Sequence, residues 1–189
     1  MPTTKPQWTP LTIFAFGWGI LGVCASLTTG LLRLSPRTLE ALAMELDAAH
    51  WIFAVTWTVF MAYTEGYRGF QRRFSPTVVA RAVHLTHEPR FLRVTLAPFF
   101  CMGFFHGTRK RVILSWSLTV GIICLVLFVH SLAQPWRGLI DLGVLVGLTW
   151  GMASIAVLAI RAAQSGTSWD PQLPHDNGVE GAQTAMEGD

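Results

Sequence analysis

FLRVTLAPFFCMGFFHGTRKR, residues 91–111, places a mostly apolar stretch directly before a cluster of positive charge. Whether residues 91–106 cross a membrane, dip into it or lie on it decides the topology of the whole chain. A transmembrane helix needs about 20 apolar residues, and this stretch is shorter and contains Arg93. Pro98 lacks a backbone donor, so a helix should break or kink there. We therefore predict a re-entrant or interfacial segment at 91–106.

The basic residues around this segment give a second argument that it does not cross. If it crossed, Arg72 and Arg73 would face the side opposite Arg109, and one basic cluster would be translocated against the positive-inside rule. If it does not cross, one loop holds a large share of the 14 lysines and arginines: Arg68, Arg72, Arg73, Arg81, Arg90, Arg93, Arg109, Lys110 and Arg111. A chain with five spans and an external C-terminus is the alternative.

The composition is that of an integral membrane protein. Of the 189 residues, 51% are hydrophobic and 13% are charged, and the mean hydropathy is +0.43. Soluble domains carry roughly 25% charged residues. We therefore expect an all-α integral membrane protein with a transmembrane domain over residues 1–161. The acidic tail at 162–189 is rich in small and polar residues, which predicts disorder.

Four blocks are long and apolar enough to be predicted as transmembrane helices. They cover about residues 11–32, 48–65, 112–133 and 139–160. The loop between the second and third blocks, residues 66–111, carries the basic cluster and is therefore expected to be cytoplasmic. Both termini then lie in the cytoplasm, and the protein lies in an inner membrane of the bacterial type.

The predicted cytoplasmic loop contains SPTVVARAVHLTHEP, residues 75–89, which has helix signals at both ends. Ser75 can cap a helix, Pro76 suits its first turn and Pro89 ends it. Polar and apolar residues separate onto two faces, which predicts an amphipathic helix lying on the inner leaflet or on the bundle. In the preceding EGYRGFQRRF, two glycines are expected to let the chain turn as it leaves the membrane.

Small residues four apart predict close helix packing, because they let two helix backbones approach each other in lipid. The fourth span carries such a stripe, and the first span carries a weaker one. The two stripes can pair within one chain, or one of them can face another subunit. They consist of Gly143, Gly147 and Gly151, and of Gly22, Ser26 and Gly30.

Basic residues that flank the cytoplasmic loop predict a docking surface for anionic lipid or for a partner subunit. Lipid headgroups are the nearest anions at a membrane surface, so nucleic acid is not expected as a partner. The residues concerned are Arg68, Arg72, Arg73, Arg109, Lys110 and Arg111.

Histidines allow two cofactor hypotheses. His50 and His130 lie at the outer ends of two predicted spans, at a similar depth, and could be the axial ligands of a haem. His84 and His87, with Glu65 and His106 as further ligands, could hold zinc or iron. Ordinary hydrogen bonding explains all of these residues more simply, so we expect no cofactor.

The sequence contains no motif for covalent catalysis or nucleotide binding, and we predict no catalytic residues. We predict a non-enzymatic polytopic membrane protein that acts as an oligomer or as an accessory subunit of a membrane complex. A small channel or transporter built around residues 91–106 is the first alternative. A haem- or metal-binding redox protein is the second.

Overall fold

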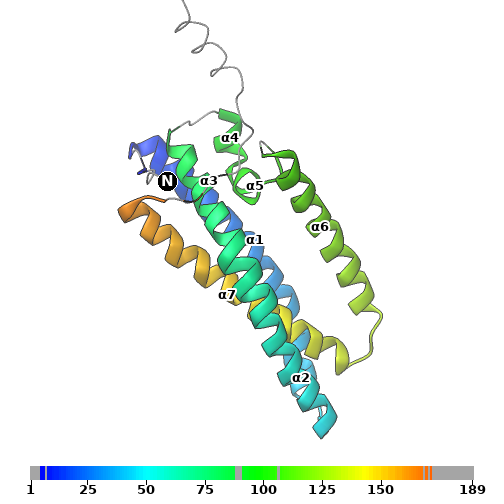
Figure 1. Ribbon diagram of the computed structural model, residues 1–189. Coiled ribbons are helices and arrows are strands. Elements are labelled where there is room, and N and C mark those ends of the chain that lie inside the picture. The colour runs from blue at the N-terminus through cyan, green and yellow to red at the C-terminus, as the bar shows by residue number, and fades with distance from the viewer. Residues whose placement is uncertain are drawn as a thin grey trace, which may run out of the picture.

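The computed structural model describes residues 5–6, 8–87, 91–105, 107–167, 169 and 171. All regular elements in this part of the chain are helices, as predicted. The start of α1 and the end of α7 lie at the same end of the bundle (Figure 1), which we call the inner end. In chain order the elements are α1 (Pro10–Leu42), α2 (Ala48–Met61), the π-helix η1 (Ala62–Phe74), α3 (Ser75–His87), α4 (Phe91–Thr95), α5 (Ala97–Met102), α6 (Arg109–His130) and α7 (Trp136–Ser165).

Helix α1 begins at a capping box and runs further than predicted. The Thr9 side chain accepts a hydrogen bond from the Thr12 N–H at 3.3 Å, and the Thr9 N–H donates to Thr12 Oγ1 at 2.8 Å. These bonds satisfy backbone donors that the first turn leaves unpaired. The helix passes through Pro36 and ends at Leu42, so it is 33 residues long rather than the 22 expected at 11–32.

The second predicted span does not end at residue 65. Helical backbone continues without a break from α2 through η1 into α3, and neither Gly66 nor Gly69 has a positive φ. The predicted turn in EGYRGFQRRF is therefore wrong. A Cβ on Gly66 would lie 3.1 Å from the Trp150 side chain of α7, so this glycine makes room for a neighbouring helix instead of turning the chain.

Helix α3 lies inside the bundle and not on a membrane surface. It packs against α1, α5 and α7, and every residue from Ser75 to Val83 is buried. Arg81, on the face predicted to be polar, has no exposed surface at all. Of the two positions predicted for this amphipathic helix, the structure therefore has the one on the bundle, with both faces covered.

Residues 91–105 form two short helices with a break between them. α4 has five residues and α5 has six, so neither is long enough to span a membrane. The break falls at Leu96, and Pro98 lies in the first turn of α5, where its missing N–H costs no hydrogen bond. Gly103 ends α5 with φ 88°, and the Phe104 N–H then donates to the Phe99 carbonyl at 3.1 Å, as in a Schellman motif.

α7 is the central helix, and α6 stands apart (Figure 1). α7 packs against α1, α2, η1 and α3, whereas α6 touches the bundle mainly at its two ends. Near its start, the Ser115 hydroxyl donates to the Met102 carbonyl at 3.2 Å, and near its end Val129 is buried. Between these points its described side chains are mostly exposed and apolar, including Ile122, Ile123 and Leu127.

Two helices, α1 and α7, are long and apolar enough to cross a membrane. α6 has a shorter apolar stretch at Ser115–His130. α7 also begins three residues earlier and ends five residues later than the span predicted at 139–160. The four-span topology stays a prediction.

Candidate functional site

Glu65 lies deep in the bundle rather than at its inner end, where the predicted end of the second span would have put it. Its carboxyl group packs against Gly147 of α7, and a Cβ added to that glycine would lie 3.0 Å from Glu65 Oε2. Gly147 is within four residues of the midpoint of α7, which is roughly 5 Å along the helix axis. The depth follows from the continuous helix, because the chain goes on for another 22 residues before α3 ends at His87.

One oxygen of the Glu65 carboxyl is buried without a partner in the described part of the chain, while the residue as a whole is half-buried. Its Oε2 atom is buried and has no hydrogen-bond partner among the described residues, and the same holds for the Thr58 hydroxyl seven residues earlier. Arg68, which follows in the same π-helix, is exposed and forms no ion pair with Glu65. A buried carboxyl oxygen without a partner is uncommon in proteins, and Glu65 Oε2 is the clearest chemical feature of the bundle.

The glycine stripe of α7 faces α2 and η1 of the same chain. A Cβ on Gly143 would lie 2.7 Å from Trp57, and one on Gly151 would lie 2.5 Å from Phe70. Trp57 Nε1 also donates to the Ile140 carbonyl at 3.1 Å. The three glycines thus leave room for an aromatic ring, the Glu65 carboxyl and a second aromatic ring.

The small residues of α1 have other partners, so the two stripes do not pair with each other. Gly22 lies against Pro98 of α5, and Gly30 lies 3.3 Å from Leu148 of α7, measured from the position a Cβ would take. Ser26 is exposed and donates its hydroxyl to the Gly22 carbonyl at 3.0 Å.

The predicted basic docking residues fall into two separate groups. Arg68, Arg72 and Arg73 are all exposed on η1, beside Phe70, and we call them the η1 arginines. The Arg72 guanidinium lies 5.4 Å from the centre of the Tyr67 ring, close enough for a cation–π contact. The second group begins with Arg109, exposed at the start of α6, while the side chains of Lys110 and Arg111 lie outside the described part of the structure.

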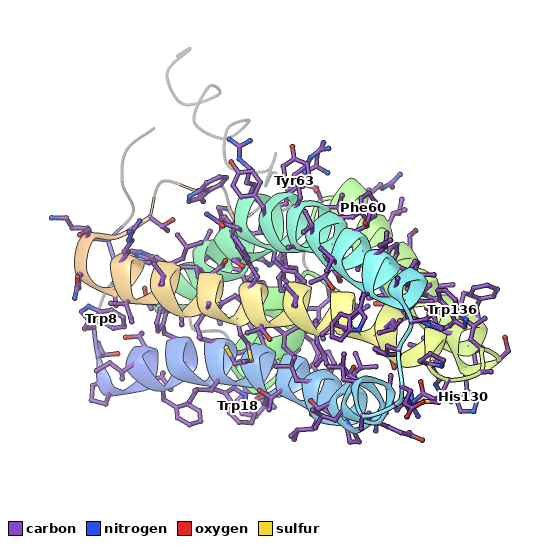
Figure 2. All side chains as sticks on the ribbon, turned by 90° about the horizontal axis from the view of Figure 1, so that it is seen from below. Trp8, Trp18, Phe60, Tyr63, His130 and Trp136 are labelled. Atoms are coloured by element: carbon purple, nitrogen blue, oxygen red, sulfur yellow. The ribbon has the colours of Figure 1, made fainter. Side chains whose placement is uncertain are left out.

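The two histidines considered for haem lie at the outer end, and each has a partner of its own. His50 Nδ1 is 2.6 Å from the Asp47 carboxylate, and its ring lies 4.6 Å from that of Trp136. His130 Nδ1 is 2.7 Å from the Arg137 guanidinium. Figure 2 shows His130 and Trp136 at one end of the bundle and Trp8 at the other. No hydrogen bond or ring contact among the described residues joins His50 to His130.

Asp47 caps α2 and is the carboxylate that His50 contacts. Its side chain accepts a hydrogen bond from the His50 N–H at 2.9 Å. This backbone hydrogen bond, followed by the charge of the imidazole, lowers the pKa of Asp47. A capping carboxylate also suits the positive end of the helix dipole, so this pair is explained by helix capping.

The residues considered for a metal are not brought together. Glu65 and His84 are separated by nineteen residues of continuous helix, which is on the order of 25 Å. His84 instead lies 3.2 Å from an Arg93 guanidinium nitrogen. His106 is outside the described residues. Within the described part of the chain, no group of three or more histidine, cysteine or acidic residues could hold a metal ion.

A buried arginine cluster at the inner end was not predicted from the sequence. Arg81 of α3 donates to the Phe105 carbonyl at 2.9 Å and to the Pro171 carbonyl at 3.3 Å, and its guanidinium lies 4.4 Å from the Phe100 ring centre. The Arg93 guanidinium lies 5.8 Å from the centre of the same Phe100 ring. These contacts tie α3, α5 and the segment after α7 together. The only signal in the sequence is an arginine flanked by alanines within a valine-rich stretch.

Comparisons with protein-family models, with curated proteins and with solved structures found no match to this chain.

Proposed function

We propose that this chain is a four-span protein of a bacterial-type inner membrane that acts as a non-enzymatic subunit of a larger membrane complex. Its spans are α1, the continuous rod of α2, η1 and α3, and the helices α6 and α7. Its docking surface for a partner subunit is formed by the η1 arginines.

Support for membrane insertion beyond α1 and α7 comes from α6. Its described side chains between Trp116 and Phe128 are mostly exposed and apolar, on a helix with little lateral packing. Large exposed apolar surfaces are rare on soluble monomers. If lipid hydrocarbon surrounds α6, its exposed apolar side chains need no other protein surface to cover them.

The observation that carries the docking proposal is the depth of the η1 arginines. Phe70, which lies between them in sequence, packs against Gly151, and Gly151 is next to the midpoint of α7. If α7 spans the membrane, the backbone that carries these exposed arginines lies within the hydrocarbon layer. Charged side chains there are costly and usually face other protein or water. A partner subunit with carboxylates or other acceptors would supply the missing environment.

The packing of α5 favours a structural role for residues 91–105 over a pore. Ala97, Phe100 and Cys101 are completely buried against α1 and α3. Pro98 fills the space left by Gly22. A segment held in this way acts as a brace between two helices.

The test is native mass spectrometry of the chain extracted gently from its own membrane. We expect it to arrive with another polypeptide in a fixed ratio. The triple variant Arg68→Gln, Arg72→Gln, Arg73→Gln should lose that polypeptide, because the variant removes the charges that the partner recognises. Arg109→Gln, at the predicted inner surface, is the matched control and should keep it.

Two results would overturn the proposal. If native mass spectrometry detects the chain alone, or only with copies of itself, the chain has no partner subunit. A triple variant that loses bound anionic lipid but no polypeptide would show that the η1 arginines anchor the chain to lipid headgroups.

A further inference from the structure

We propose that the Glu65 carboxyl group is a proton-binding site in the interior of the bundle, where it exists as a neutral carboxylic acid at neutral pH. The proposal concerns a single side chain and stands whether or not a partner subunit docks on η1.

The first observation is the fit between Glu65 and α7. The Glu65 Cγ and Cδ atoms would each lie 3.2 Å from a Cβ on Gly147, and Oε2 would lie 3.0 Å from it. A larger residue here would press on the carboxyl, and the Glu65 side chain would have to shift by a few tenths of an ångström. The stripe of glycines in α7 therefore includes a position fitted to a carboxyl group as well as positions fitted to aromatic rings.

The second observation is that no positive charge among the described residues forms an ion pair with this carboxyl. The charged residues nearest to it along its own helix and along the neighbouring helices are Arg68 on η1, Arg137, Asp141 and Arg161 on α7, and Arg33 on α1. Arg68, Arg161 and Arg33 are exposed. Asp141 is negative when ionised, and the Arg137 guanidinium lies 2.7 Å from His130 Nδ1.

The cost of charge decides between the two forms of Glu65. An unpaired carboxylate in a low-dielectric interior loses its hydration, and that loss costs several kcal/mol. A neutral acid avoids most of this cost and can donate its proton in a hydrogen bond. With Oε2 buried and unbonded among the described residues, the neutral acid is the form that this site accommodates.

The third observation is the π-helical backbone around Glu65. η1 begins at Ala62, three residues before Glu65, and its wider turns continue to Phe74. π-helical turns are rare, and they are frequent at functional sites because they change the direction in which side chains point. Here they occur where the only acidic residue between Asp47 and Arg73 meets α7.

The test uses dicyclohexylcarbodiimide, an apolar reagent that reacts with protonated carboxyl groups inside membrane proteins. The carboxyl oxygen bonds to the central carbon of the reagent while the acid proton moves to one of its nitrogens. Rearrangement then gives a stable N-acylurea, so the modified peptide gains the full mass of the reagent. The full chain in lipid vesicles is treated over a range of pH and digested for mass spectrometry.

We expect the adduct on Glu65 at neutral pH, with a yield that declines as the pH rises and the acid loses its proton. Glu65→Gln should lose the adduct completely. Glu45→Gln, which changes an exposed carboxyl in the connection between α1 and α2, should leave it unchanged. Gly147→Ala should lower the yield, because the added methyl group displaces the carboxyl.

An infrared spectrum supplies a readout that needs no reagent. At neutral pH the wild-type chain should show a carboxylic C=O stretching band that Glu65→Gln lacks and Glu45→Gln retains. The proposal is overturned if folded wild-type chain shows neither the band nor the adduct. Protection of Glu65 from the reagent by sodium at constant pH would also overturn it, since the bound ion would then be a metal cation and not a proton.

Discussion

Gly138 shows how little space α7 leaves to its neighbours at a single residue. A Cβ there would collide with the Ala41 methyl group and lie 2.5 Å from the Arg37 carbonyl oxygen, both on α1. Backbone atoms cannot move aside as a flexible side chain can. Gly121 of α6 is the opposite case, because nothing lies within 4 Å of the position its Cβ would take.

These two glycines make a matched pair of alanine substitutions. Gly138→Ala should destabilise the chain by about 1–3 kcal/mol, as overpacking of a tight contact usually does. Gly121→Ala should leave stability unchanged or raise it by up to about 1 kcal/mol, because alanine favours a helix over glycine. Unfolding in detergent micelles measures both. Equal effects of the two substitutions would contradict the close α1–α7 contact.

The predicted position of Glu65 in the membrane depended on the prediction of where the second span ends. Its distance from lipid headgroups could not be known from the sequence, because the chain was expected to turn at Gly66 and Gly69. The same two glycines are compatible with a turn and with close helix packing. Only the position of Trp150 on another helix decides between these uses.

At the scale of elements, the short helix α5 acts as a brace that α1 is built to receive. Pro98 lies against Gly22, and Cys101 lies against Gly19. The break in this segment was predictable from Pro98 and from its length. The site on α1 where α5 packs was not predictable, because Gly22 belongs to a stripe of small residues that is equally suited to packing against another transmembrane helix.

The docking of α5 can be tested through Cys101, which is completely buried. In a background with Cys24→Ala and Cys124→Ala, Cys101 should react very slowly with a maleimide, since thiol reagents need an accessible thiolate. Gly22→Ala should speed the reaction, because its methyl group collides with Pro98 and drives α5 from α1. Adding Pro98→Ala removes part of the collision and should restore protection.

Two outcomes would contradict this account of α5. One is fast labelling of Cys101 in the background chain without any further substitution. The other is a rate that does not change with Gly22→Ala, since α5 would then not depend on that glycine.

At the scale of the whole molecule, the helical class and the places of α1 and α7 in the chain follow from the sequence, but both helices are longer than the predicted spans. Each helix contains a long run of residues without charge, and charged residues lie towards the helix ends. The continuous helical rod from Ala48 to His87 could not be predicted from the sequence, because the basic stretch after Glu65 resembles the end of a transmembrane span. Long-range packing of Gly66 and the enclosure of Arg81 hold that stretch in the bundle.

The most direct test of the four-span account is labelling of single cysteines in intact cells with a maleimide that cannot cross the membrane. The native cysteines are first replaced by alanine. Ser131→Cys, in the connection between α6 and α7, should be labelled from outside. Thr108→Cys, just before α6, should be labelled only after the cells are permeabilised. The reverse pattern at these two positions would mean that residues 91–106 cross the membrane or that the whole chain is inverted, and the account with four spans and cytoplasmic termini would be wrong.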